Sequence, residues 1–475
     1  MENVTHKGLK KSFGLRMAIV IVISSIIGSG VFKKVAPMSD TLGSPLLVVA
    51  AFALAGLLTL FGMWSIAELG SMYPESGGPF AWLEKIYGKT ISFLYGWASF
   101  TVIQSAAIAS IAFVFAGAIG TYIELPHLPE HLASFSILGI QPLDNIGAKL
   151  IACALIAILS LVNIRGAKWG GNLSMIFTVI IILCILMIVM ISFGSSVGNA
   201  HTFTTPSTVV SVEKLSLWGL IGAIIVAMRH AFWAYEGWMS LGFVGEELEK
   251  PEKDISRAVT IGLLIIVFLY VLVNAAYLYV MPIDDIIRET TKDENKIAAV
   301  LVIDKIFGNG GAHIISSMIL IATLGCTNAT ILASARIYYA MAKKGLFFER
   351  IKKTHSKYNT PHNSLILQCV WACLLVFSGS FDLLTDLVVI VAFSFYGLIV
   401  FGVIILRKKA SHTTRPYKTI GYPVIPIIFC IFCIVLLVVT FIESPEKSFT
   451  GLFLIFSGLP FYYFWKKKLS KALSQ

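Results

Sequence analysis

The sequence is poor in charged residues. Only 13% of its 475 residues are Asp, Glu, Lys or Arg, whereas 57% are hydrophobic and the mean hydropathy is +0.84. Soluble domains carry about 25% charged residues, so this balance excludes a soluble globular protein. Long apolar runs with few charges are typical of chains that cross a lipid bilayer many times. We therefore predict an all-α membrane protein embedded in a lipid bilayer.

Motifs of enzymes are missing as well. The sequence contains no Walker phosphate-binding loop, nucleophile triad or dinucleotide fingerprint, which argues against an enzyme, an ATP-driven pump and a bound cofactor. A metal site is not expected, because the pair His127-x-x-x-His131 is interrupted by Pro129. All seven cysteines lie in apolar runs, where cysteine behaves as a small apolar side chain.

Twelve apolar segments have the length of a membrane-spanning helix. They cover 15–36, 43–72, 88–120, 146–163, 172–193, 215–242, 258–281, 313–342, 363–380, 384–406, 421–442 and 447–465. The net charge of +11 comes mainly from basic residues between these segments. The side that holds both termini carries 26 lysines and arginines, and the opposite loops carry 8. This asymmetry predicts cytoplasmic termini, and it explains the net charge without a nucleic-acid partner.

The first apolar segment contains Gly28-Ser29-Gly30 at its centre. Each glycine weakens a helix, and serine can hydrogen-bond to nearby backbone. A helix that opens here leaves backbone groups unpaired at membrane depth, which is tolerated only inside protein or around a water-filled cavity. The half-helix beyond the break would direct free N–H groups and a positive dipole end at an anion. We expect a substrate carboxylate to bind here.

The sixth segment is interrupted in the same way, by Phe232-Trp233-Ala234-Tyr235-Glu236-Gly237-Trp238. Interrupted helices at matching positions of two halves are typical of inverted-repeat transporters with a binding site at the membrane midplane. The alternative is that these glycines allow close packing between intact helices. Because each interruption falls in the first helix of a five-helix set, we prefer broken helices.

The two interruptions resemble motifs of the amino acid–polyamine–organocation (APC) superfamily, and within it of the L-type amino acid transporter family in its prokaryotic form. Further matching stretches follow in the expected order: Gly245-Glu246-Glu247, Ala335-Arg336, Arg415-Pro416-Tyr417 and Gly421-Tyr422-Pro423. The resemblance implies the leucine-transporter fold, with twelve transmembrane helices that include a 5+5 inverted repeat. It divides the chain into a cytoplasmic N-terminus (1–14), two repeats (15–193 and 215–406), two additional helices (421–465) and a cytoplasmic tail (466–475).

The resemblance also implies roles at the site. Ser29 and Gly30 would donate hydrogen bonds to the substrate carboxylate, and Trp233 would cover the substrate as an outer gate. The backbone carbonyls expected to accept from the substrate ammonium group are those of Ile26, Trp233, Ala234 and Glu236. We include Gly28, Tyr235 and Gly237 in the predicted site because they belong to the same two interruptions.

Glu236 places a carboxylate at membrane depth, where ionisable groups usually have a function. Three roles stay open: a structural ion pair with Arg229, a proton-linked coupling role, and direct contact with a cationic substrate. In the seventh segment, Tyr270, Asn274 and Tyr277 share one helix face by their spacing, which fits either a gating role or packing between helices.

The fifth segment departs from the family pattern. Many sodium-independent relatives carry a lysine there, but Ile181 occupies that position in this chain. Coupling inferred from that lysine therefore does not carry over. Thr323, Thr327 and Thr330 of the eighth segment are candidates for a cation site, although hydroxyls in such helices usually bond to their own helix.

We predict a secondary transporter of L-amino acids in the bacterial cytoplasmic membrane, most simply a sodium-independent exchanger of small neutral amino acids. Glu236 suggests an alternative, a proton-coupled carrier or antiporter of cationic amino acids or polyamines. A sensor or channel on the same scaffold is a third class. Many animal relatives pair with a glycoprotein through a disulfide, but residues 122–147 contain no cysteine, so no disulfide-linked subunit is expected. The oligomeric state stays open.

Overall fold

The computed structural model describes residues 11–136, 141–210, 215–292, 297–308, 310–378 and 381–473. Across these ranges the chain is helical, and strand pairing is limited to one isolated bridge between Phe13 and Leu248. The prediction of an all-α protein is confirmed. The outer parts of the predicted cytoplasmic segments, 1–10 and 474–475, lie outside the described residues.

Ten helical runs of the described chain are long and apolar enough to cross a membrane. They are α4 (Pro45–Met72), the continuous run α6–η1–α7 (Lys89–Ala98, Ser99–Ile103 and Gln104–Ile119), α9 (Ile146–Ile164), α10 (Ala167–Gly194), α12 (Leu217–Tyr235), α14 (Pro251–Val280), α17 (Gly311–Lys343), α19 (Phe381–Lys409), α20 (Val424–Glu443) and the pair α21–α22 (Pro445–Phe456 and Gly458–Leu473). Two apolar helices are shorter, α1 (Leu15–Ile26) and α18 (His362–Ser378). Each of the twelve predicted segments therefore contains an apolar helix, and ten reach membrane-spanning length.

Two predicted segments are divided among several helices. The first continues after α1 as α2 (Gly30–Lys33) and α3 (Val35–Leu42), and the sixth continues after α12 as α13 (Ser240–Phe243), which the short 3₁₀ turn η2 (Gly245–Glu247) follows. The interruptions predicted from the glycines are present in both.

A third irregularity was not predicted. The turn η1 is π-helical, and the N–H of Gln104 donates to the carbonyl of Ser99, five residues earlier. Such turns are frequent at functional sites. Residues 99–103 contain neither glycine nor proline, so no local signal marked the position.

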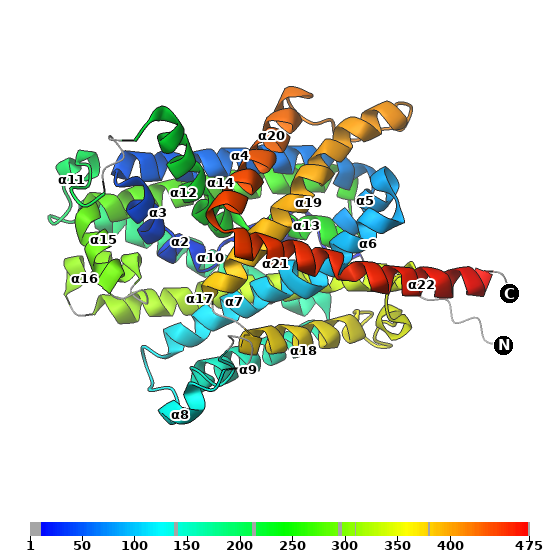
Figure 1. The fold of residues 1–475 in the computed structure, drawn as a ribbon, viewed down its shortest axis with the longest axis horizontal. Coiled ribbons are helices and arrows are strands. Elements are labelled where there is room, and N and C mark those ends of the chain that lie inside the picture. Colours follow the sequence, from blue (N-terminus) through cyan, green and yellow to red (C-terminus); the bar gives the residue numbers. More distant parts are fainter. Residues whose placement is uncertain are drawn as a thin grey trace.

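Short helices close the two ends of the bundle (Figure 1). At one end lie α8 (Glu130–Ala133), α11 (Ala200–Thr204), α15 (Ile283–Lys292) and α16 (Ala298–Phe307), and at the other lies α5 (Pro79–Tyr87). The turn η3 (Glu349–Lys352) follows α17 in the chain. α15 buries Ile283, Ile286 and Ile287 on one side, but it is too short and polar to be predicted as a span.

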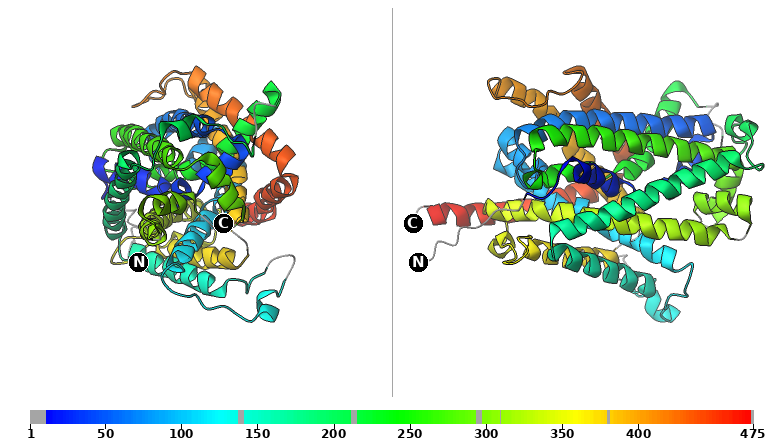
Figure 2. Two further views of the ribbon diagram at one scale, coloured as in Figure 1. Left: turned by 90° about the vertical axis from the view of Figure 1, so that its left-hand side faces the viewer. Right: turned by 180° about the vertical axis from the view of Figure 1, so that it is seen from behind.

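The long helices run side by side, with α7 and α17 at the centre (Figures 1 and 2). In their most apolar stretches, 78% of the α6–α7 run and 72% of α17 are buried, against 28% of α20. The central helices contact protein on nearly all sides, whereas α20 exposes Ile431, Ile434 and Val438. An exposed apolar face of this kind suits contact with lipid.

The start of the described chain and the end of α22 lie at the same end of the bundle. Phe13 pairs with Leu248, which closely precedes α14 in the chain. α14 runs from there to α15, at the left of Figure 1, so Phe13 lies toward the right, where α22 also ends. This arrangement agrees with an even number of membrane crossings.

Candidate functional site

The first apolar helix ends where its glycines begin. α1 stops at Ile26, Ile27 is extended (φ −73°, ψ 94°), and helical geometry resumes at Gly30. Within the described part of the chain, the N–H groups of Gly28, Ser29 and Gly30 make no hydrogen bond to another backbone group. The break therefore presents unpaired donors.

α12 breaks at the matching place. It ends at Tyr235, Glu236 is extended (φ −62°, ψ 150°), and Gly237 has φ +108°, a value that favours glycine. A Cβ added at Gly237 would lie 2.1 Å from the carbonyl oxygen of Ser25 in the other break. The two breaks therefore touch each other. The alternative of glycines packed between intact helices is wrong, because neither helix is intact.

The two breaks border a cavity with about 420 Å³ of space that no protein atom fills. Seven predicted site residues line it, namely Ile26, Gly28, Ser29, Gly30, Trp233, Glu236 and Gly237. Six further lining residues lie outside the predicted substrate-binding set, namely Ser25, Gln104, Ala107, Ile111, Cys326 and Thr330. Most of these belong to α7 and α17, where no local motif marks them.

Three side-chain oxygens of lining residues lack a partner. Ser25 Oγ, Ser29 Oγ and Glu236 Oε2 are buried and make no hydrogen bond within the described structure. Other buried polar atoms of the described structure are unpaired as well, among them the Tyr277 and Thr327 hydroxyls, but these three lie around one cavity, where a polar ligand could hydrogen-bond to them. The donors of the first break suit an anionic group, and the Glu236 carboxylate suits a cationic one. The cavity is thus suited to a molecule that carries both charges.

A sequence comparison agrees with this geometry. The family model described as "Amino acid permease" matches residues 13–464 of the chain, a range that contains both breaks. The chain belongs to the amino acid permease family. The predicted APC membership is confirmed, and the permease is a transport protein rather than an enzyme.

Three relatives show how far the similarity of the permease extends. It is 32% identical to the serine/threonine exchanger SteT of Bacillus subtilis, over 97% of this chain and 98% of that protein. It is 28% identical to the human b(0,+)-type amino acid transporter 1, over 98% and 91% of the two chains. The human large neutral amino acids transporter small subunit 2 is also 28% identical, over 97% and 82%.

A residue of α19 holds the Glu236 side chain of the permease in place. The Tyr396 hydroxyl donates to Oε1 at 2.5 Å, while Oε2 has no partner. Arg229 makes no ion pair with Glu236 in the described structure, and its Nε has no hydrogen-bond partner. The structural ion pair considered from the sequence is therefore absent, and the two charges stand apart.

Two predicted residues lie outside the cavity wall. The Tyr235 hydroxyl donates to the carbonyl of Phe52 on α4 at 3.1 Å, so its side chain extends away from the cavity. Ala234 packs beneath Gly30, where an added Cβ would lie 2.5 Å from the Ala234 Cα. Both residues stabilise the contact between the broken helices and their neighbours.

Tyr270 of α14 connects the two breaks. Its hydroxyl oxygen lies 3.2 Å from the Ile26 carbonyl oxygen and 3.1 Å from the Ala234 carbonyl oxygen. The single hydroxyl proton is therefore shared between the two carbonyls. These carbonyls were expected from the sequence to accept from a substrate ammonium group, and Tyr270 competes for them. Asn274 donates to the Tyr270 carbonyl at 2.7 Å. Asn274 and Tyr277 are fully buried outside the cavity wall, which fits packing rather than gating.

Two of the three threonines considered for a cation site bond to their own helix. Ile181 is only 2% exposed. The hydroxyls of Thr323 and Thr330 each donate to a carbonyl one turn earlier in α17, and the Thr327 hydroxyl has no partner in the described structure. Nor do the described residues contain a group of three or more His, Cys, Asp or Glu side chains that could hold a metal ion.

α1 is joined to α17 directly. Ser24 Oγ donates to the Gly325 carbonyl at 3.0 Å, and Cys326 Sγ donates to the Ser25 carbonyl at 3.4 Å. These contacts hold the unwound end of α1 against the central helix. They join residues 301 positions apart, a distance over which a sequence motif gives no signal.

Proposed function

We propose that the permease exchanges small neutral L-amino acids across the membrane, without sodium, by alternating access. The observation that carries this proposal is the set of three unpaired oxygens around one cavity between two broken helices. An L-amino acid bears a carboxylate and an ammonium group on one carbon atom. The carboxylate would accept from the N–H groups of Gly28, Ser29 and Gly30 and from the Ser29 hydroxyl. The ammonium group would donate to Glu236.

The rest of the cavity favours a small, uncharged side chain. Ala107, Ile111 and Trp233 supply an apolar wall. The relative SteT is named as a serine/threonine exchanger, which supports small substrates. Trp233 would cover the substrate as the outer gate.

Reciprocal helix packing supports an inverted repeat of segments 15–193 and 215–406. α1 packs on α14 while α12 packs on α4, so the first helix of each half meets the second helix of the other. Likewise α10 packs on α17 and α19 packs on α7. We propose that α1, α4, α12 and α14 rock against the remaining helices around the midplane. On this basis we propose the leucine-transporter fold of twelve helices, with 421–465 outside the repeat.

We also propose that both termini face the cytoplasm and that the protein resides in a bacterial cytoplasmic membrane. The excess of lysine and arginine on the side of the chain ends supports this orientation. One relative is named as a small subunit. Because residues 122–147 contain no cysteine, we expect the permease to act without a disulfide-linked glycoprotein.

One observation favours a second function. Glu236 has no cationic partner among the described residues, and a carboxylate in this position would suit a cationic amino acid or polyamine carried with protons. Under this alternative, Glu236 would bind the substrate side chain or a proton.

Exchange in proteoliposomes distinguishes the two functions. Vesicles loaded with unlabelled serine, arginine or nothing would be supplied with labelled serine or arginine, with and without pH and sodium gradients. Entry of serine that requires a neutral amino acid inside and ignores both gradients is the expected result. Entry of arginine into empty vesicles, driven by a pH gradient, would replace the first proposal with the second.

A further inference from the structure

One face of α12 leads from its first turn to the cavity. Gly222, Val226, Arg229 and Trp233 follow one another at intervals of three or four residues, so they share a face of the helix. A Cβ added at Gly222 would meet no atom within 4 Å. Val226 and Arg229 are half-buried, and Trp233 lines the cavity. We call these four residues the α12 stripe.

Arg229 brings an unpaired charge to the α12 stripe. Its guanidinium makes no ion pair in the described structure, and Nε is buried without a hydrogen-bond partner. An arginine this far along a membrane helix is costly when it faces lipid, and such residues nearly always face a protein interior or a water-filled path. The stripe therefore fits the wall of a water-filled approach to the cavity.

The surroundings of Arg229 do not cancel its charge. The adjacent ring of His230 experiences the charges of Lys34, Arg229, Asp386 and Lys447. Asp386, the acidic member of this group, is already paired with Lys447 at 2.6 Å. The Lys447–Asp386 pair is close to neutral, so it leaves the charge of Arg229 in place.

The cavity at the inner end of the α12 stripe has the opposite character. Glu236 lies two helical turns after Arg229 in the chain, and its Oε2 is unpaired. By itself this carboxylate would attract arginine, lysine or a polyamine as well as a neutral amino acid. Selection against cations therefore needs a second group outside the cavity.

We propose that Arg229 is a specificity-determining residue that keeps cationic amino acids away from Glu236. A neutral amino acid has no net charge, so it passes a single fixed cation at little cost. An amino acid with a cationic side chain is repelled, and at roughly 10 Å in a medium of effective dielectric about 20 the repulsion corresponds to about tenfold in affinity. This inference rests on the proposed exchange of neutral amino acids.

The test is inhibition of serine exchange by arginine in proteoliposomes. In Arg229→Gln, the arginine concentration that halves serine exchange should fall about tenfold relative to wild type. Arg229→Lys keeps the charge and should keep the wild-type value. Arg288→Gln removes an exposed arginine from α15 and serves as the matched control. In the double variant Arg229→Gln/Glu236→Gln, the gain in arginine inhibition should disappear.

A second measurement needs no variant. High potassium chloride shortens the Debye length to about 3 Å at 1 M, so arginine should inhibit wild-type exchange more strongly there than at low salt. If Arg229→Gln does not give monodisperse protein, arginine inhibition can be compared between wild type and Arg229→Met, and between low and high salt.

Equal arginine inhibition in wild type and the neutral variants, with serine exchange measurable in both, overturns the inference and leaves the proposed function standing. Failure of the wild-type protein to exchange serine overturns the proposed function instead.

Discussion

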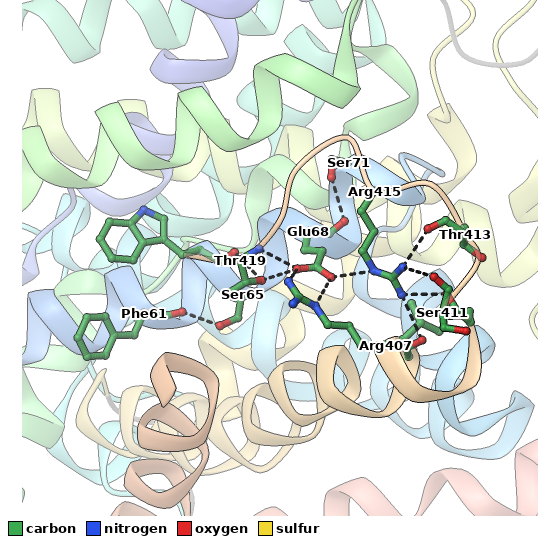
Figure 3. A network of polar contacts seen from close by, with 12 residues as sticks. Phe61, Ser65, Glu68, Ser71, Arg407, Ser411, Thr413, Arg415 and Thr419 are labelled. Carbon is green, nitrogen blue, oxygen red and sulfur yellow. Dashed lines mark hydrogen bonds and ion pairs between the residues drawn. The ribbon is translucent and has the colours of Figure 1, made fainter. Parts of the chain in front are cut away.

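Two glutamates on membrane-spanning helices of the permease have opposite surroundings. Glu68, near the end of α4, accepts from Arg407 at 2.6 and 2.9 Å, from Arg415 at 3.2 Å, and from the N–H and hydroxyl of Thr419 at 2.8 Å (Figure 3). Glu236 accepts one side-chain hydrogen bond, on Oε1, and its other oxygen is unpaired. Both carboxylates are withdrawn from bulk water, but only that of Glu68 has hydrogen-bond and ion-pair partners on both oxygens.

The difference separates a structural group from a functional one. Glu68 holds α4 against α19 and the segment that follows it, as the converging side chains in Figure 3 show. Its partners leave no oxygen for a ligand. Glu236 has the capacity that Glu68 lacks, and it lies beside a cavity. A buried carboxylate oxygen without a hydrogen-bond donor costs free energy. This cost fits a binding site in which the substrate supplies the missing donor.

The largest expected effect comes from Glu68→Ala. The substitution leaves Arg407 and Arg415 half-buried without a carboxylate, and breaking a fully buried pair would cost about 3–5 kcal/mol, an upper bound here. Thermal unfolding in detergent should show a much lower midpoint. Glu349→Ala, which removes a carboxylate that is 69% exposed, is the control and should leave the midpoint unchanged. Equal midpoints for the two variants would contradict a structural role for Glu68.

Glu236→Gln should separate function from stability. The variant loses a charge-assisted hydrogen bond to the substrate ammonium group, which corresponds to about a tenfold to hundredfold loss of apparent affinity. The unfolding midpoint should change far less than in the Glu68 variant, because no partner charge is stranded. Serine exchange and thermal unfolding are measured on the same preparation. Wild-type affinity, or a collapse in stability, would remove the contrast between the two glutamates.

Tyr396→Phe should have a smaller effect of the same kind. It removes the donor that orients Glu236, and loss of one hydrogen bond is worth about 1 kcal/mol, or roughly fivefold in apparent affinity. Tyr235→Phe is the matched control, because that hydroxyl donates to Phe52 away from the cavity. Serine exchange over a range of concentrations measures both. If the control lowers affinity as much, Tyr396 does not act through Glu236.

The smallest effect concerns a third carboxylate, outside the spans. Burial opposes ionisation of Asp284, but hydrogen bonds from the Ser207 hydroxyl and from the N–H and hydroxyl of Thr208 hold its pKa below the usual value of 3.8. A lowered pKa stabilises the fold at pH values above the ordinary pKa, and this stabilisation is lost as pH falls through the folded pKa.

Asp284→Asn should therefore flatten the decline of the unfolding midpoint at acidic pH. Between about pH 5 and pH 3, wild type should lose slightly more thermal stability than the variant. Unfolding scans across this range measure the difference. A steeper decline in the variant would show that Asp284 is not stabilised in its ionised form.

The predictions that succeeded were local ones. Gly28-Ser29-Gly30 and Glu236-Gly237 indicated helix breaks because the conformational freedom of glycine is a property of the residue itself, and both breaks are present. Contacts between distant elements were left open. The ion pair of Glu236 with Arg229 was one of three roles considered, and in the described structure Tyr396 of α19 supplies the contact instead.

The sequence by itself determined the class of protein, the apolar segments and the two places where helices open. Composition, helix length and glycine content act over a few residues, so they can be read without the fold. Only the tertiary structure brought Gln104, Tyr270 and Cys326 to the two breaks. It also gave Glu68 partners on both carboxylate oxygens and left one oxygen of Glu236 without a partner. Pairing between distant helices depends on how the whole bundle packs, and no local pattern encodes it.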